Sequence, residues 1–219
     1  MGSITRSFAN NITTSGVLLP ASLTNNSIAN VTAYNAAIAT GGMKLISSQT
    51  ASNSASLSFT TGIDSTYKEY QFWFIDIHPR TDNAHFSFNL STDSGSNYNV
   101  TKTTTSFQSQ HDEADTASAL TYVAANDLAQ STAYQVLAAN NGIGNGADES
   151  FVGSMSLFNP ASTTYVKHFI STNTYYLNVD YTINTFIAGY GNTTSAINAV
   201  DFKMSTGNFD GTILMYGIV

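Results

Sequence analysis

The chain has 219 residues, of which 42% are hydrophobic and only 10% are charged, and its formal net charge is −7. A globular protein typically has roughly 25% charged residues, and Ser, Thr, Asn, Gly and Ala fill the deficit here, which disfavours a cytosolic enzyme that stays soluble through charge. The acidic balance without a basic stripe excludes nucleic acid and anionic membranes as partners, and the absence of cysteine excludes disulfides, thiolate zinc sites and cysteine nucleophiles.

This composition suits a protein that works outside cells or packs into an assembly, yet the sequence shows no export signal. Met1–Asn10 contains one arginine and lacks the apolar segment of a secretory signal, and no run approaches the ~20 apolar residues of a membrane span. We therefore expect synthesis in a cytoplasm without export by the general route. Virion proteins meet both conditions, because they assemble inside the host and reach the exterior by lysis.

Residues 1–42 differ from the rest of the chain and are predicted to form an N-terminal anchoring arm. Their apolar residues are spread among Asn, Ser and Thr, so the segment cannot bury enough surface to fold alone. We expect it to lie extended against a partner, and a tail packed on its own domain is the alternative. A short helix at Ala29–Ala39 is compatible with the pattern, and Gly41-Gly42 is a plausible hinge. The predicted anchoring residues are Ile4, Phe8, Ile12, Val17, Leu18 and Leu19.

Residues 43–219 read as one all-β domain. Roughly nine to eleven predicted strands recur every 8–15 residues without a long helical pattern, which is typical of an antiparallel β-sandwich or jelly roll. Asp127–Ala139 is compatible with either a helix or a long loop, and the apolar Thr212–Val219 is expected inside a sheet. The other candidate segments for these strands are Met43–Ser48, Ser54–Phe59, Tyr70–Ile77, Ala84–Leu90, Tyr98–Phe107, Leu120–Ala124, Phe151–Phe158, Thr164–Ile170, Tyr175–Tyr181, Ile183–Tyr190 and Ala199–Met204.

The densest polar cluster is His111-Asp112-Glu113-Ala114-Asp115. Hard oxygen ligands this close make Asp112, Glu113 and Asp115 weak candidates for binding Ca²⁺, although the order of an EF-hand loop is missing. A solvated acidic loop is the simpler interpretation. His78 and His85 flank the Pro79 turn and are the nearest histidine pair for a metal.

The sequence offers no catalytic signature. Nothing singles out a pair of carboxylates across a cleft, and no nucleophile elbow or phosphate-binding loop is present. We therefore expect no cofactor and no catalytic residue. The aromatic residues allow sugar stacking: Trp73, between two phenylalanines, is expected to pack in the core, whereas Tyr175, Tyr176 and Tyr190 are better candidates for an exposed face.

Several segments resemble the C-terminal domain of virion structural proteins of marine tailed phages. They are Leu57–His78, with Ser-Phe-Thr-Thr-Gly-Ile-Asp-Ser-Thr-Tyr-Lys-Glu-Tyr, then His78–Asn83, Leu157–His168 and Phe202–Tyr216. The opening Ile4–Ser15 is similar to the N-terminal arm of such proteins. The resemblance covers most of the chain and implies a place on the particle, but it supplies no catalytic residues.

The resemblance implies a non-enzymatic structural protein of a tailed-phage virion, displayed on the exterior as a capsid decoration or cement protein or as a tail or fibre appendage. Other virion proteins are the expected partners. Homo-oligomerisation, with a trimer as one option, would bury apolar faces and edge strands that a monomer must protect. The alternative is a carbohydrate-binding module of a phage fibre that recognises a host-surface glycan. A polysaccharide-degrading enzyme is disfavoured because no pair of acids is evident.

Overall fold

The computed structural model describes residues 42–138 and 141–219. The chain divides between Thr40 and Gly41. Residues 1–41 of the predicted arm, with all of its anchoring residues, lie outside the described residues. The described part of the chain contains no helix, and hence none that could span a membrane. The strands are β1 (Met43–Ser54), β2 (Ser56–Phe59), β3 (Glu69–Pro79), β4 (Phe86–Ser91), β5 (Lys102–Asp112), β6 (Ser118–Tyr122), β7 (Gln135–Val136), β8 (Phe151–Phe158), β9 (Lys167–Leu177), β10 (Tyr181–Gly191), β11 (Ala199–Met204) and β12 (Phe209–Ile218).

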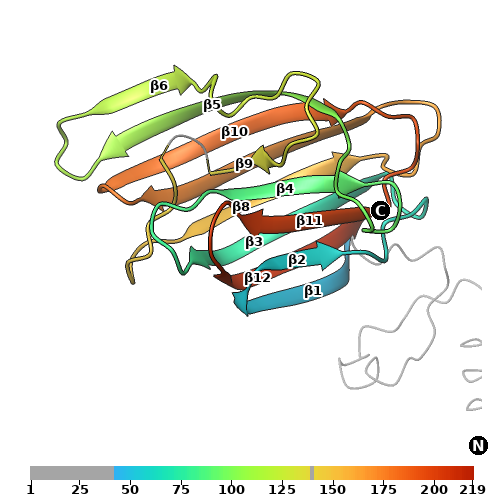
Figure 1. Cartoon of the computed structure of the whole chain (residues 1–219), viewed down its shortest axis with the longest axis horizontal. Helices are drawn as coiled ribbons and strands as arrows, with labels where there is room; N and C mark the ends of the chain where they lie inside the picture. The colour runs from blue at the N-terminus through green and yellow to red at the C-terminus, as the bar shows by residue number, and fades with distance from the viewer. Residues whose placement is uncertain (1–41, 139–140) are drawn as a thin grey trace, which may run out of the picture. The chain divides into compact units, whose positions relative to one another are not determined.

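The strands form two antiparallel sheets of unequal size that face each other as a β-sandwich (Figure 1). The large sheet has eight strands in the order β1-β12-β3-β8-β9-β10-β5-β6, and the small sheet has four in the order β2-β11-β4-β7. The all-β prediction is confirmed. The C-terminal apolar strand lies between β1 and β3, inside the large sheet as expected.

The structure corrects two predicted elements and decides between the two alternatives for a third. The strand predicted from Tyr98 begins only at Lys102. The backbone groups before it bond elsewhere: the Tyr98 carbonyl accepts a hydrogen bond from the Asn89 amide, and Val100 N–H bonds to Leu90 O. The strand predicted at Tyr175–Tyr181 is split by the β9–β10 turn, where Asp180 has a φ of 61°. The uncertain stretch after Asp127 is irregular backbone with the two-residue β7, and its described part contains no helix.

Phenylalanine side chains fill the space between the sheets, and Phe202 of β11 lies at their centre. Its ring centroid is 5.2 Å from that of Phe74 and 5.3 Å from that of Phe72, both on the large sheet. Phe59, Phe86 and Phe88 of the small sheet place their rings 6.1, 5.9 and 6.3 Å away. Because aromatic residues bury the largest apolar area per side chain, this cluster is the principal hydrophobic contact between the two sheets.

Polar side chains join the core beneath β9, β10 and β5, where the segment around β7 covers the large sheet. Thr104 Oγ1 donates to Gln135 Oε1 at 2.6 Å, and Thr185 Oγ1 donates to the Leu137 carbonyl at 2.9 Å. All four residues are buried, apart from a small exposed fraction of Thr104. Since a buried polar group costs free energy unless it is hydrogen-bonded, these bonds fix the covering segment in place.

Gly153 on β8 shows how closely the backbone approaches this polar layer. A Cβ added to Gly153 would meet Asn173 Oδ1 on the neighbouring β9. The Asn173 side chain is buried, and its Oδ1 accepts a hydrogen bond from Ser171 Oγ at 3.0 Å. Glycine at position 153 therefore makes room for a buried amide that any larger residue would displace.

Replacing Phe202 by alanine should destabilise the domain by about 3–5 kcal/mol, because it removes a fully buried ring and leaves a cavity between the sheets. Urea unfolding of the full chain would measure the change. The matched control is Tyr165→Ala, whose side chain is 70% exposed, with an expected effect within about 0.5 kcal/mol. Equal effects of the two substitutions would show that the ring cluster does not hold the sheets together.

Candidate functional site on the outer face of the large sheet

The outward face of the small sheet is largely covered by the chain itself. The Asn89 amide donates to the carbonyls of Tyr98 and Thr132 at 2.6 and 3.0 Å, and Asp201 accepts hydrogen bonds from Ser58 Oγ and Tyr134 Oη at 2.5 and 2.9 Å. Asn89 and Asp201 are therefore buried although they point away from the core. Burial raises the pKa of the Asp201 carboxyl. This covering leaves the large sheet as the one with an open outward side.

The outward face of the large sheet, called the outer face below, is a grid of aligned side chains. The antiparallel register places residues in rows that run across the strands. The first row is Met43, Ile218, Glu69, Phe158, His168, Tyr190 and Thr103. The second is Leu45, Tyr216, Gln71, Ser156, Ile170, Ala188 and Thr105. The third is Ser48, Leu214, Trp73, Ser154, Thr172, Phe186, Phe107 and Tyr122. The fourth is interrupted by the register shift between β3 and β8: Thr50, Thr212 and Ile75 lie on one side of the shift, and Val152, Thr174, Asn184, Ser109 and Leu120 lie on the other.

The outer face is almost free of charge and exposes large apolar side chains. Among the residues of these rows Glu69 is the only carboxylate, and none is a lysine or arginine. Ile170 is 54% exposed, and Trp73 and Phe107 are each 40% exposed. The Trp73 and Tyr216 rings lie 5.4 Å apart. A contiguous apolar surface without charge is typical of a site that another molecule covers.

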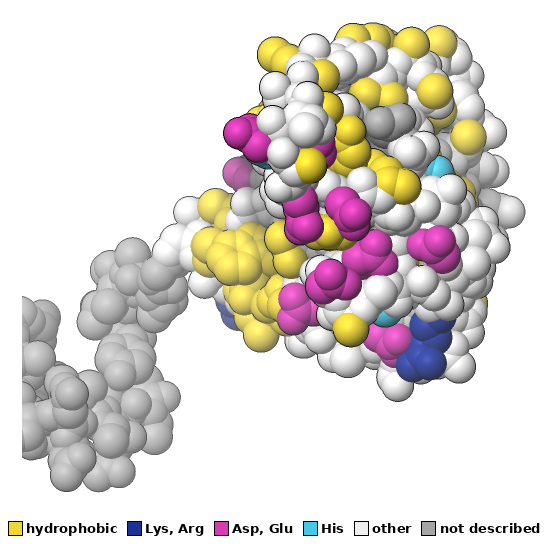
Figure 2. Space-filling view, turned by 90° about the vertical axis from the view of Figure 1, so that its left-hand side faces the viewer, with side chains coloured by type: hydrophobic (Ala, Val, Ile, Leu, Met, Phe, Trp, Pro, Cys, Tyr) yellow, Lys and Arg dark blue, Asp and Glu magenta, His cyan; other side chains and the backbone are white. Residues whose placement is uncertain are grey.

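Carboxylates gather instead at one end of the sandwich, as Figure 2 shows. This is the end that carries the β5–β6 and β9–β10 turns (Figure 1). Carboxylates are thus frequent at this end, whereas the four rows of the outer face contain only Glu69.

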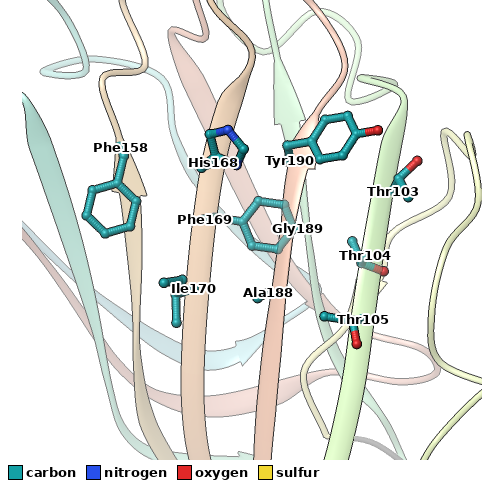
Figure 3. Close-up of a pocket in the computed structure, with 10 residues that line it drawn as sticks. All are labelled: Thr103, Thr104, Thr105, Phe158, His168, Phe169, Ile170, Ala188, Gly189 and Tyr190. Atoms are coloured by element: carbon teal, nitrogen blue, oxygen red, sulfur yellow. The ribbon is translucent and has the colours of Figure 1, made fainter.

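A groove of about 620 Å³ opens on the outer face (Figure 3). Figure 3 shows it crossing β8, β9, β10 and β5, with residues of the first two rows on its surface. The small side chain of Ala188 lies between the larger Ile170 and Thr105, which explains the hollow. The lining residues are Thr103, Thr104, Thr105, Phe158, His168, Phe169, Ile170, Ala188, Gly189 and Tyr190.

The groove combines aromatic rings with hydroxyl groups and contains no carboxylate. The His168 and Tyr190 rings are 5.9 Å apart and tilted to each other. Thr103 Oγ1 accepts a hydrogen bond from the Gln130 amide at 2.7 Å, which orients the hydroxyl at the edge of the groove. The lining can stack against a ring and exchange hydrogen bonds with a neutral polar ligand. It offers no pair of acids for glycoside hydrolysis.

Comparison with protein-family models, with curated proteins and with solved structures finds no match to this chain.

The three weak calcium candidates lie at the β5–β6 turn but do not converge. A hydrogen bond from the Thr116 hydroxyl lowers the pKa of the Asp112 carboxyl most, and bonds from Ala117 N and Thr116 N, at 2.8 and 2.9 Å, lower it further. Asp115 instead faces His111, with 3.2 Å between Oδ1 and Nε2. Asp112 ends a strand and is buried, so the cluster is only in part the expected solvated loop. The calcium site stays a prediction without geometric support.

The histidines proposed as a metal pair bind separate carbonyl groups. His78 Nε2 lies 2.9 Å from Gly146 O, and His85 Nδ1 lies 2.8 Å from Ala138 O. Within residues 42–138 and 141–219, no three histidine or acidic side chains gather as a metal site requires.

Two predictions about aromatic residues were wrong, both for the same physical reason. Trp73 was expected in the core but points outward, whereas Tyr175 was expected on a surface but is 2% exposed. Both lie in strands whose two faces carry aromatic or apolar residues, so alternation cannot tell the inward side from the outward side. Tyr176 and Tyr190 are half-buried on the outward side. In the sequence, the feature that could have indicated an uncharged outer face is the low number of charged residues in strands β8 to β10.

Lys102 is a buried cation that has no carboxylate partner among the described residues. Its side chain is fully buried, and Nζ donates to Val100 O at 2.8 Å and to the Asn89 side-chain oxygen. Burial lowers the pKa of the Lys102 ammonium to about 7, from 10.5. Burial also lowers the pKa of Lys167, whose Nζ bonds to the carbonyls of Tyr165 and Thr193. Carbonyl groups thus replace counter-ions at both sites.

The domain should become more stable as the pH rises from 7 to 9, and Lys102→Met should reduce this increase. In that range the unfolded chain keeps the Lys102 proton while the folded chain releases it, so the contribution to stability rises by up to about 1.4 kcal/mol per pH unit. Below pH 7 both states bind the proton and the contribution is flat. Urea unfolding of both proteins at pH 7, 8 and 9 measures the two slopes; identical slopes contradict the assignment.

Proposed function

We propose that this chain is a non-enzymatic structural protein of a tailed-phage virion, displayed on the particle exterior as a capsid decoration or cement protein or as a tail or fibre appendage. In this proposal residues 1–42 anchor it to the particle and the sandwich packs against neighbouring subunits. The observation that carries the proposal is the open outer face, which exposes apolar residues such as Trp73 and Ile170 and whose four rows contain Glu69 as their only carboxylate. Interfaces between assembled subunits have this composition at their centres.

We also propose that the sandwich is a jelly roll enlarged by four strands. Eight strands form two facing layers, β1-β12-β3-β8 and β2-β11-β4-β7, in which the first strand pairs with the last and the second with the one before the last. β9, β10, β5 and β6 then extend the first layer. Jelly rolls occur in viral capsid proteins and in lectins, so this topology supports both candidate functions without choosing between them.

The outer face also supports homo-oligomerisation, with a trimer as one arrangement. Closed symmetry would allow each copy to bury its exposed apolar rows against another copy. The carboxylates at the turns would stay in water, where they keep the assembled particle soluble. Association and solubility would then be served by different residues, because the apolar rows and the turn carboxylates lie on different sides of the domain.

Particles assembled with the Val152→Lys variant should contain at least about tenfold less of the chain than particles with the wild-type chain. Val152 is 41% exposed on β8, the fourth of the eight strands of the large sheet, and a lysine buried there without a partner opposes association. Immunoblots of purified particles measure incorporation. Val179→Lys, on the β9–β10 turn and 49% exposed, is the matched control.

Labelling intact particles with antibodies against the chain distinguishes the locations. Signal over the head indicates decoration or cement, and signal at the tail or a vertex indicates an appendage. Removal of residues 1–42 tests the arm separately, because the truncated chain should fold but fail to be incorporated. Purified particles of the encoding phage that lack the chain altogether would falsify the proposal.

The groove favours carbohydrate binding as a second candidate function. Its His168 and Tyr190 rings and its threonine hydroxyls present the stacking and hydrogen-bonding groups that neutral sugars use. The absence of charge from its lining favours a neutral glycan over an acidic one.

If the groove binds a glycan, Tyr190→Ala should weaken that binding at least about tenfold, because loss of one stacking ring removes about 1.4 kcal/mol or more. A glycan array identifies the ligand, and titration calorimetry with and without EDTA measures its affinity and any need for Ca²⁺. Tyr165→Ala is the control, since Tyr165 lies outside the groove lining. No binding at millimolar glycan, or equal binding by both variants, rules this function out.

A further inference from the structure

The β6 strand leaves one edge of the large sheet open. Val123 N–H bonds to Ser106 O at 2.8 Å, and Asp112 N–H bonds to Ala117 O at 3.1 Å. In an antiparallel pair every second residue bonds to the neighbouring strand. Together with the β5–β6 register, the two bonds therefore show that Ala119 and Thr121 bond to β5. The alternate residues, Ser118, Leu120 and Tyr122, direct their backbone N–H and C=O groups away from β5.

Nothing in the described part of the chain covers β6. All five of its side chains are exposed, and Leu120 is 75% exposed. Figure 1 places β6 beyond the reach of the small sheet, and Figure 2 shows exposed hydrophobic side chains towards the same top side of the molecule. Both faces and one edge of the strand are therefore open to a partner.

The other three sheet edges carry features that oppose pairing. β1 contains Lys44 and two register irregularities, at Leu45–Ser47 and Ala51–Ser54, while β2 has four residues and β7 has two. Charge, bulges and short length are the usual protections of an edge strand. β6 has five uncharged residues, no proline and an uninterrupted register with β5.

We propose that β6 is a dimerisation edge, where it pairs antiparallel with β6 of a second copy of this chain about a two-fold axis through Leu120. In this register Leu120 faces its own counterpart, and Tyr122 faces Ser118 of the other copy. All outward N–H and C=O groups of these three residues then find partners, because a strand paired with itself in antiparallel register is self-complementary. The absence of charge from β6 means that self-pairing brings no like charges together.

The choice of a second copy as partner follows from this self-complementarity together with the outer face. A two-fold axis normal to the sheet places both outer faces on the same side. Leu120 and Tyr122 belong to the outer face rows that contain Val152 and Phe107. The pairing would therefore join two outer faces into one continuous surface. This inference concerns the edge alone and does not depend on the virion role.

The test is the association of the full chain in sedimentation velocity, compared with Leu120→Lys, Leu120→Glu and the control Val179→Lys. The wild-type chain and the control should dimerise. Leu120→Lys and Leu120→Glu alone should each raise the dissociation constant at least about tenfold, because like charges meet on the axis and a leucine contact is lost. An equimolar mixture of the two variants should recover dimers, since opposite charges then face each other.

Hydrogen exchange identifies the edge itself. The amides of Leu120 and Tyr122 should become protected as the protein concentration rises, whereas the amide of Val179 should not. Thermal unfolding confirms that the variants fold, as expected for a side chain that is 75% exposed. A monomeric wild-type chain, association unaffected by both charged variants, or a dimer with unprotected Leu120 and Tyr122 amides would each overturn the proposal. Pairing with a different protein instead of a second copy would appear as the first of these outcomes.

Discussion

The packing of Phe202 against rings from both sheets is the interaction on which the described domain depends. Its contacts with Phe72 and Phe74 on one side and with Phe59, Phe86 and Phe88 on the other join a four-stranded sheet to the middle of an eight-stranded one. Four strands cannot cover eight, so the remaining area of the large sheet must be covered by another segment or left open. The rest of the structure follows from that mismatch.

On the inner side of the large sheet, the area that the small sheet does not cover is covered by the segment around β7, which hydrogen bonds hold in place. Thr104 and Thr185 bind the segment around β7 across the core, and the Lys102 ammonium bonds to Val100 O and Asn89. Such a layer tolerates little change, because each buried polar group that loses its partner costs free energy. The lowered pKa of Lys102 is the electrostatic consequence of a cation enclosed by neutral groups.

On its outer side the large sheet has no covering segment among the described residues. The exposed Trp73, Ile170 and Phe107, the groove beside His168, and the open edge at Leu120 all belong to this one surface. The proposed place in an assembled particle would give a physical reason for such a surface, since neighbouring subunits would exclude water from it. Glycan binding in the groove and subunit contacts elsewhere on the face are compatible, because the groove occupies only the first two rows.

The sequence by itself determined the all-β class, most strand positions and the interior place of the last strand, because strand alternation and turn residues are local signals. It did not determine which side of each strand faces the core. Trp73 and Tyr175 were assigned to the wrong sides because both faces of their strands carry large residues, and only pairing with the neighbouring strands selects one. The groove, the open edge at Leu120 and the buried Lys102 likewise arise from residues far apart in the chain, so only the tertiary structure could decide them.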